Sequence, residues 1–254
     1  MEFAHRVVVV TGASKGIGEA TAVAFLREGA RVAALDITPD PPAFVAGAQS
    51  GSIYLRCDVA AAREVQKAVE SIIGTFGGVD ILINTAGIQT YNTVTSTSEE
   101  EWDRTMGVNL KGAFLCAKHC IPSMLERGKG VIVNVASVQA FVSQKGVAAY
   151  TTSKTGILGL TRSIAVDYAP AVRCVAVCPG SVDTPMLRWA IQQSEDPDAV
   201  MQECIDMHPL KRVGTPQEVA ELILYLASDK ASFITGQYVR IDGGLGLSIA
   251  GSKR

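Results

Sequence analysis

The stretch VVVVTGASKGIGEA, residues 7–20, decides the fold of this chain. The valine run is typical of a strand buried on both faces, and Gly12, Gly16 and Gly18 lead from it into a segment with helical periodicity. Glycines let the backbone turn tightly and approach a phosphate closely, and a helix N-terminus offers free N–H groups and the positive end of a dipole. The spacing is G-x3-G-x-G and not the commoner G-x-G-x-x-G. This strand, loop and helix predict a dinucleotide site, with a purely structural turn as the alternative.

The rest of the chain repeats this alternation of strand and helix. Apolar runs rich in Val and Ile predict strands at residues 7–11, 32–35, 53–55, 81–83, 131–135, 172–177 and 238–241. Helical periodicity occupies residues 17–28, 62–76, 100–124, 149–168 and 217–227. Because alternating strands and helices imply βαβ crossovers, we predict an α/β fold of Rossmann type, a doubly wound, seven-stranded and mainly parallel sheet with helices on both faces. No linker or repeat divides the chain, so a single domain is expected over residues 1–254.

Two segments depart from the alternation. The segment TPDPPAFVAGAQSG (38–51) is too rich in Pro and Gly for a full helix, so the second crossover is expected to be short. The span 179–215 is much longer than a normal connection, with helices expected at 186–193 and from Asp196-Pro197 to about residue 207. Long excursions beside the carboxyl end of a strand are where α/β enzymes keep substrate lids. We therefore expect a substrate lid at about residues 183–214.

Composition limits the classes of partner. The chain has 254 residues, 48% of them hydrophobic, and a formal net charge of −2 with the two signs interspersed, which disfavours nucleic acid and anionic membranes as partners. Because no apolar run is as long as a membrane span and no signal-peptide layout precedes the valines, a cytoplasmic protein is expected. No zinc-like pattern of Cys and His occurs, so no metal is predicted and the cysteines are interpreted as buried free thiols in a reducing compartment. These cysteines are Cys57, Cys116, Cys120, Cys174, Cys178 and Cys204.

Two acids and one base bear on the choice of cofactor. Asp36 closes the second strand, where an acid accepts hydrogen bonds from the adenosine ribose, and its charge would repel a 2′-phosphate. Lys15 points mildly the other way, because a base in the glycine loop can pair with a 2′-phosphate. Since no Arg or Lys follows Asp36 before Pro39, we predict NAD, with NADP disfavoured. Asp58 lies just past the third strand, where it would accept from the adenine amine.

The motifs taken together resemble those of a known family. A Tyr and a Lys four residues apart, as in AAYTTSKTG (148–156), occur by chance in many proteins, but here they stand in a specific series. The series is TGASKGIG (11–18), Asp58, NTAG (84–87), Asn109, Ser137, Tyr150, Lys154, PGSVDTPM (179–186) and IDGG (241–244). In this order and spacing the chain resembles the compact form of the short-chain dehydrogenase/reductase family over essentially its whole length. One departure is Thr85, where the family usually has a second Asn.

The resemblance implies hydride transfer between a secondary alcohol and nicotinamide. Tyr150 is then the acid/base, and Lys154 its electrostatic partner, which also hydrogen-bonds the nicotinamide ribose. A free phenol has a pKa of about 10, and an ammonium one helical turn away, together with oxidised nicotinamide, would lower that pKa. Ser137 would steady the substrate oxygen, and Asn109 would kink its helix and hold a water in a proton relay. The alternatives are that Ser137 is only a loop residue and that Asn109 is an ordinary polar residue of a helix.

The resemblance also implies which residues contact the cofactor and how copies of the chain assemble. The implied cofactor-binding residues are Gly12, Ser14, Lys15, Gly16, Ile17, Gly18, Asp36, Ile37, Asp58, Val59, Asn84, Ala86, Gly87, Tyr150, Lys154, Pro179, Gly180, Val182 and Thr184. Members of this family commonly form tetramers through the long helices at 100–124 and 149–168, so a homotetramer is expected. The terminal segment GLGLSIAGSKR (244–254) either lies on a neighbouring subunit or frays.

The substrate is a small molecule, expected to be a sugar. Within the family the chain is most similar to aldose 1-dehydrogenases, on the combination of SVQA (137–140), AVDYAPAVRC (165–174), CPGSVDTPM (178–186), MHPLKRVG (207–214) and ASFITG (231–236). Polar or aromatic contacts to a sugar are expected from Gln89, Ser137, Gln139, Tyr150, Trp189 and His208. Trp189 has the alternative of anchoring the lid to the core. The alternatives for function are a dehydrogenase or reductase of a ketoacyl thioester, polyol or steroid, or a non-catalytic dinucleotide-binding protein.

Overall fold

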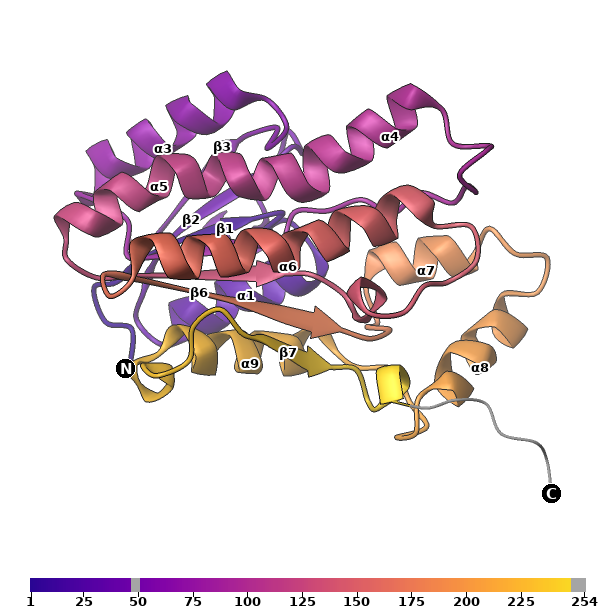
Figure 1. Cartoon of the computed structure of the whole chain (residues 1–254). Coiled ribbons are helices and arrows are strands. Elements are labelled where there is room, and N and C mark those ends of the chain that lie inside the picture. The colour runs from indigo at the N-terminus through magenta and orange to yellow at the C-terminus, as the bar shows by residue number, and fades with distance from the viewer. Residues whose placement is uncertain (47–50, 248–254) are drawn as a thin grey trace.

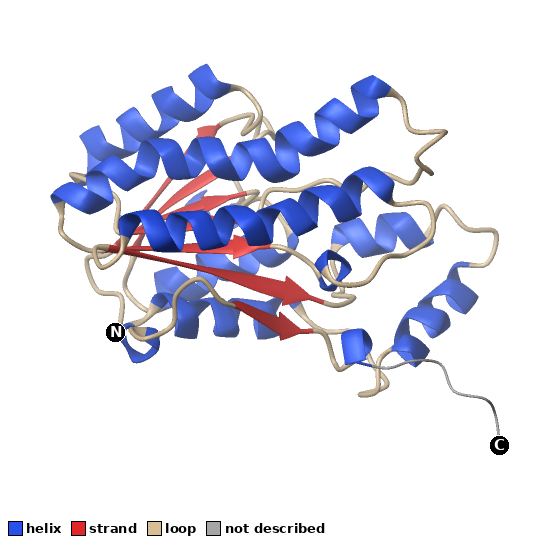
Figure 2. Ribbon diagram, in the orientation of Figure 1, coloured by secondary structure: helices blue, strands red, loops and turns tan. Residues whose placement is uncertain are grey.

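One parallel seven-stranded sheet runs through the protein in the strand order β3-β2-β1-β4-β5-β6-β7 (Figures 1 and 2). The computed structural model describes residues 1–46 and 51–247. The strands are β1 (Val7–Thr11), β2 (Arg31–Asp36), β3 (Ser52–Arg56), β4 (Ile81–Asn84), β5 (Gly130–Val135), β6 (Val172–Pro179) and β7 (Tyr238–Ile241). All seven predicted strands are confirmed, and every described pairing between them is parallel.

Helices cover both faces of this sheet (Figure 1). The α-helices are α1 (Gly16–Arg27), α2 (Ala43–Ala46), α3 (Ala62–Phe76), α4 (Glu99–Met106), α5 (Gly112–Glu126), α6 (Ala148–Tyr168), α7 (Pro185–Ile191), α8 (Pro197–Met207) and α9 (Pro216–Ala227). The short helices are η1 (Gly107–Lys111), a π-helix, and the 3-10 turns η2 (Val138–Ala140), η3 (Asp229–Ala231) and η4 (Leu245–Leu247). Helices α3, α5 and α6 pack on one face and α1 and α9 on the other. The predicted doubly wound single domain is confirmed.

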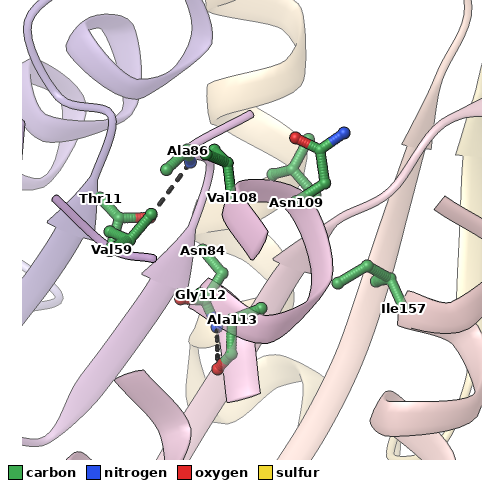
Figure 3. Close-up of a pocket in the computed structure, with 10 residues that line it drawn as sticks. Thr11, Val59, Asn84, Ala86, Val108, Asn109, Gly112, Ala113 and Ile157 are labelled. Carbon is green, nitrogen blue, oxygen red and sulfur yellow. Dashed lines mark hydrogen bonds between the residues drawn. The ribbon is translucent and has the colours of Figure 1, made fainter. Parts of the chain in front are cut away.

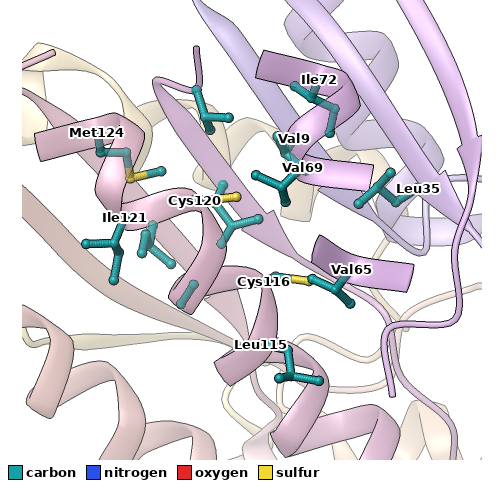
Figure 4. Close-up of a cluster of buried hydrophobic side chains, with 14 of the residues drawn as sticks. Val9, Leu35, Val65, Val69, Ile72, Leu115, Cys116, Cys120, Ile121 and Met124 are labelled. Atoms are coloured by element: carbon teal, nitrogen blue, oxygen red, sulfur yellow. The ribbon is translucent and has the colours of Figure 1, made fainter. Parts of the chain in front are cut away.

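The valine run explains how the two layers are held to the sheet. Val7 and Val9 lie in the core beneath α3 and α5 (Figure 4), whereas Val8 and Val10 lie in the core beneath α1 and α9. Alternate side chains of a strand point to opposite faces, so both faces of β1 need apolar residues, and all four valines are fully buried. Burial of each such side chain contributes roughly 1.5–3 kcal/mol.

Three expectations need adjustment or have limits. The helix expected at 100–124 is interrupted by the π-helix Gly107–Lys111. The second crossover is short, since α2 has four residues, but residues 47–50 lie outside the described part of the chain. Residues 248–254 also lie outside the described part of the chain. The two alternatives for the terminal segment, contact with a neighbouring subunit or fraying, therefore stay predictions.

Other observations concern membranes, metals and thiols. Among the helices of residues 1–46 and 51–247, none is long and apolar enough to cross a membrane. The same residues contain no group of three or more His, Cys, Asp or Glu side chains that could hold a metal ion. The prediction of buried free thiols is confirmed for five of the six cysteines, whereas Cys204 on α8 is partly exposed.

Candidate active site

The glycine loop packs tightly on the end of β4. Gly12 has a φ of 63°, and a Cβ there would lie 2.8 Å from the Ala86 Cα, so only glycine fits. The Thr11 hydroxyl accepts hydrogen bonds from the backbone N–H groups of Thr85 and Ala86, both at 3.1 Å (Figure 3 shows the second). The Thr85 hydroxyl in turn donates to the Thr11 carbonyl. The departure from the family pattern at Thr85 therefore keeps the strand ends joined.

The N-terminus of α1 presents its backbone to the loop. Its N-cap residue, Lys15, makes no side-chain capping bond, so the first N–H groups of the helix keep no side-chain partner. Gly16 has a φ of 61°, and a Cβ there would lie 3.3 Å from Thr184 Cγ2. The loop thus meets the segment that follows β6, and the cradle between them suits a pyrophosphate.

Acidic side chains stand where the adenosine half of a dinucleotide would lie. Asp36 is only 8% exposed, and its two oxygens accept the N–H groups of Ser14 at 2.9 Å and of Thr38 at 3.2 Å. A carboxylate has further acceptor capacity, so Asp36 remains able to receive ribose hydroxyls. Asp58 accepts from the Ala60 N–H at 2.9 Å through one oxygen.

A small cavity lies at the carboxyl ends of β1, β4 and β5 (Figure 3). These strands flank the point where the strand order reverses, which is where α/β sheets bind ligands. The Asn84 amide donates to Asn134 Oδ1 at 2.8 Å, and its buried Oδ1 has no hydrogen-bond partner within the described residues. The lining residues are Thr11, Val59, Asn84, Ala86, Val108, Asn109, Gly112, Ala113, Val135 and Ile157. With the glycine cradle and Asp36, these residues fit a dinucleotide.

Tyr150 and Lys154 are both buried in the first turns of α6. The Lys154 ammonium donates to the Val135 carbonyl at 2.9 Å and lies 5.7 Å from the centroid of the Tyr150 ring. Burial lowers the pKa of Lys154 to about 8, an effect that the charge of Cys178 partly opposes. Below this pH the lysine is a cation beside the phenol.

The expected lowering of the Tyr150 pKa combined the charge of Lys154 with that of bound oxidised nicotinamide, and in the protein alone burial has the larger effect. Burial raises the pKa of Tyr150 to about 12, while a hydrogen bond with Ser137 works in the other direction and the charge of Tyr91 adds to the rise. The physical reason is that removing a phenolate from water costs more than the nearby groups return. Lys154 sits over the ring and is already bonded to Val135, so its charge does not overcome burial.

Asn109 joins three segments around this pair. It lies on the π-helix, a rare form often found at functional sites. Its Oδ1 accepts from the Ile88 N–H at 2.8 Å, and its Nδ2 donates to the Ile88 carbonyl at 2.9 Å and to Ser153 Oγ at 3.0 Å. Ser153 Oγ donates to the Tyr150 carbonyl at 2.7 Å. Both N–H donors of the amide and one acceptor position of its oxygen are thus used in bonds to the protein.

Ser137 lies between the end of β5 and α6. Its hydroxyl accepts from the Gln139 N–H at 3.1 Å as the N-cap of η2, and its side chain acts to lower the pKa of Tyr150. Asn109, Ser137, Tyr150 and Lys154 are all buried. The structure therefore brings the four predicted catalytic residues together.

Residues 183–213 leave the sheet and return at the same place. Val182 and Gly214 form an isolated parallel bridge, in which the Asp183 N–H donates to the Gly214 carbonyl at 2.9 Å. Helices α7 and α8 lie beyond the carboxyl ends of β6 and β7 (Figure 1), and α8 has no buried residue. Thr184 caps α7 by accepting from the Leu187 N–H at 3.2 Å. The excursion is closed at its base, and most of its residues are exposed or partly exposed, with Ile191 and His208 buried.

His208 is buried with both ring nitrogens bonded to the protein, and its predicted contact with a substrate stays a prediction. Only 1% of it is exposed. Its Nδ1 bonds the Cys204 carbonyl at 2.6 Å, and its Nε2 accepts the Ser181 N–H at 3.2 Å. A carbonyl requires a donor and an N–H requires an acceptor, so this ring is neutral and both of its nitrogens are used. His208 holds the end of α8 against the segments that follow β6 and β7, where Gly180 and Gly243 pack against it.

The other predicted substrate residues have free or weakly held side chains. Trp189 is 52% exposed on α7, so it is not an anchor of the lid to the core. The Gln139 amide makes only long bonds of 3.4 Å, with Gln144 and Thr151. Gln89 is half-buried after β4. Two residues near Tyr150 are missing from the sequence prediction, Tyr91 and Ser153, because only the contacts of the folded chain distinguish them from their neighbours.

Known proteins resemble this chain over almost its full length. A family model described as enoyl-(acyl carrier protein) reductase matches residues 12–246. A 2-(R)-hydroxypropyl-CoM dehydrogenase of Xanthobacter autotrophicus is 40% identical over 94% of this chain and 97% of its own. A 3-oxoacyl-(acyl-carrier-protein) reductase of Thermotoga maritima is 37% identical over 96% and 99%. The ligand-free aldohexose dehydrogenase of Thermoplasma acidophilum has a TM-score of 0.92 and 41% identity, covering 99% of this chain and 98% of that one.

These relatives act on different compounds but share one architecture, and the match extends from the glycine loop to η4. Their names describe dehydrogenases and reductases. The chain therefore belongs to the short-chain dehydrogenase/reductase family and is an oxidoreductase of secondary alcohols or ketones with a nicotinamide cofactor.

Proposed function

We propose that the protein is an NAD-dependent dehydrogenase that oxidises an aldose at its anomeric carbon to the lactone. The observation that carries this proposal is the set of polar side chains around a buried Tyr150, with the amides of Gln89 and Gln139 available on two loops. A sugar needs several convergent hydrogen-bonding groups. The similarity to an aldohexose dehydrogenase supports the same substrate class.

In the proposed mechanism Tyr150 takes the proton of the substrate hydroxyl. When bound, oxidised nicotinamide supplies the hydride acceptor. Ser137 steadies the substrate oxygen, because its side chain lies close enough to Tyr150 to act on the pKa of the phenol. Since burial opposes ionisation of Tyr150, the charged form of Lys154 is needed to stabilise the phenolate. In the reverse direction, the neutral phenol that burial favours donates its proton to a carbonyl.

Asn109 is proposed to act through its backbone carbonyl and by holding two segments of the site in place. All of its side-chain bonds go to Ile88 and Ser153, so a relay water would be held by the carbonyl of the π-helical turn. The amide then fixes the distance between the strand end after β4 and the turn of α6 that carries Tyr150.

The preference for NAD is proposed from Asp36. Its buried carboxylate is locked by the N–H groups of Ser14 and Thr38, so it cannot swing away from a 2′-phosphate. Desolvation makes such a repulsion stronger than it would be in water. The side chain of Lys15 is not held in the same way as the Asp36 carboxylate, since it makes no capping hydrogen bond.

The excursion at 183–214 is proposed to be the substrate lid, and the assembly a homotetramer. The bridge between Val182 and Gly214 closes the base of the lid, while Trp189 faces solvent on α7. Phe114 on α5 and Val166 on α6 are exposed apolar side chains. Their burial between subunits would follow from packing these helices against partner copies.

A substrate panel tests the proposal. Free aldoses, simple secondary alcohols and ketoacyl thioesters are each assayed with NAD or NADP and with the reduced forms, followed at 340 nm. Turnover of one or more aldoses with NAD is expected. The proposal fails if aldoses are inert while alcohols or thioesters react, an outcome that would favour a reductase like the 3-oxoacyl relative. An Asp36→Asn variant should move the ratio of kcat/KM for NAD over NADP toward NADP.

A further inference from the structure

The 3-10 turn η2 begins directly after Ser137 and is only three residues long. Within this turn the Ala140 N–H donates to the Ser137 carbonyl and the Phe141 N–H to the Val138 carbonyl, both at 3.0 Å. From α6 the Thr155 hydroxyl donates to the Ala140 carbonyl at the long distance of 3.4 Å. Because the hydrogen bonds of a 3-10 turn have poor geometry, the segments that pack against η2 help to set the place of Ser137.

The edge strand β7 holds the end of η2 through aromatic contacts. Alternate residues of a strand point to the same side, so the side chains of Tyr238 and Arg240 lie on one side of β7. The centroids of the Tyr238 and Phe141 rings are 5.3 Å apart, and the Arg240 Cζ lies 5.6 Å from the centroid of the same Phe141 ring. A guanidinium over an aromatic ring is attracted by its π electrons. Since Phe141 stays 42% exposed, these side chains of β7 contribute much of what holds it.

The turn η4, drawn in yellow after β7 in Figure 1, packs on the start of η2. A Cβ on Gly246 would lie 3.0 Å from Val138 Cγ2 and 2.8 Å from Arg240 Nη1, so the turn is in close contact with both residues. Arg240 Nη1 donates to the Gly246 carbonyl at 3.1 Å, and the buried Asp242 accepts the Gly246 N–H at 3.0 Å. Val138 directly follows Ser137 in the chain. Arg240 thus links both ends of η2 to the turn that follows β7.

We propose that Arg240 is a positioning residue of the active site, which fixes Ser137 and Gln139 by joining η2 to β7 and η4. Its guanidinium contacts the ring at the end of η2 and the carbonyl of the turn that packs on its start. A displacement of a positioned group by about 1 Å can cost on the order of a hundredfold in rate. Arg240 therefore bears on the rate of hydride transfer, although it acts only through η2. The inference rests on the role proposed for Ser137.

The test compares Arg240→Ala and Arg240→Lys with the wild type. Amide hydrogen exchange of residues 137–141 reports the hold on η2, and single-turnover hydride transfer at 340 nm reports its effect on whichever substrate of the panel above is turned over. Arg240→Ala should speed the exchange and slow hydride transfer about tenfold. Lysine keeps a cation for the ring and a donor for Gly246, so Arg240→Lys should stay within about threefold of the wild type. Unchanged exchange, or faster exchange with an unchanged rate, overturns the positioning role.

Gly246→Ala tests the same contact without removing Arg240. Its Cβ would push the guanidinium off the turn, because the two would lie 2.8 Å apart, so it should reproduce the changes of Arg240→Ala. Gly74→Ala on α3 is the matched control, since a Cβ there meets no atom of the described residues within 4 Å, and it should change neither measurement. Equal exchange and equal rates in these two glycine variants overturn the inference.

Two further variants keep the possible outcomes apart. Arg173 lies near the amino end of β6, where its guanidinium donates to three backbone carbonyls at 2.9–3.1 Å. Arg173→Ala should therefore lower the melting temperature and keep the hydride-transfer rate; if it is slowed as much as Arg240→Ala, destabilisation explains both and the inference fails. A slower reaction in Ser137→Ala with a wild-type rate in Arg240→Ala overturns the inference alone. A wild-type rate in Ser137→Ala overturns the proposed role of Ser137 and leaves Arg240 as a structural residue.

Discussion

Replacing Asn109 with alanine should damage stability and catalysis together, because one buried amide bonds three polar groups, two on the half-buried Ile88 and one on the buried Ser153. Asn109 is 2% exposed, and its loss leaves the N–H and carbonyl of Ile88 and the hydroxyl of Ser153 without these bonds. A buried polar group without a partner costs about 1–3 kcal/mol. Water entering the space left by the side chain recovers part of that, so we expect a loss of about 3–5 kcal/mol in the free energy of unfolding.

The assay is urea unfolding of Asn109→Ala and wild type at one protein concentration, since subunit association contributes to apparent stability. Steady-state kinetics on the same samples should show kcat falling, because the amide bonds Ile88 and also Ser153, whose hydroxyl bonds the Tyr150 carbonyl. Ser153→Ala, which removes one of the three partners, should cost about 1–2 kcal/mol. A loss below about 1 kcal/mol for Asn109→Ala would refute the reasoning that these bonds are unmade in the variant.

Three further outcomes follow from the site. Burial lowers the pKa of Lys154 to about 8 from its ordinary 10.5, so between these pH values the unfolded chain binds more protons than the folded chain. The free energy of unfolding of the wild type should therefore rise with pH in this window relative to that of Lys154→Met. Urea titrations in which the two free energies change with pH in parallel would contradict this. His208→Ala should leave the part-buried Ser181 N–H and Cys204 carbonyl without these bonds and cost about 1–3 kcal/mol, with faster proteolysis within 185–207; equal cleavage rates would argue against the pinning role. Gly18→Ala should abolish dinucleotide binding in calorimetry, because its Cβ would lie 2.8 Å from the Gly12 carbonyl carbon; retained affinity would show that the loop can shift.

Local patterns accounted for most of the fold. The seven strands and the long helices follow from periodicity and from Gly and Pro positions, because burial on one or both faces is written into the spacing of apolar residues. The π-helix at Gly107–Lys111 does not follow from such patterns, since it depends on how α4 and α5 meet the strand end after β4. The family motifs likewise marked the four residues around Tyr150, and the folded chain brings them together.

Side chains whose role depends on distant partners could not be read in the same way. His208 is one of the few histidines of the chain and follows a helix pattern in the lid, which made it a plausible sugar contact. Only the folded chain brings Ser181 to its Nε2 and closes it from solvent. Arg240 illustrates the reverse case, a side chain of the edge strand whose contacts with η2 and η4 exist only in the folded chain.

By itself, the sequence determined the strand, loop and helix units, the family and the residue types available for hydride chemistry, because these depend on near neighbours along the chain. The tertiary structure decided which of those groups are buried and which are paired. It shows that burial raises the pKa of Tyr150 in the protein alone, and that both ring nitrogens of His208 are bonded to the protein. Desolvation and hydrogen-bond pairing are set by residues far apart in sequence, and so only the folded chain contains them.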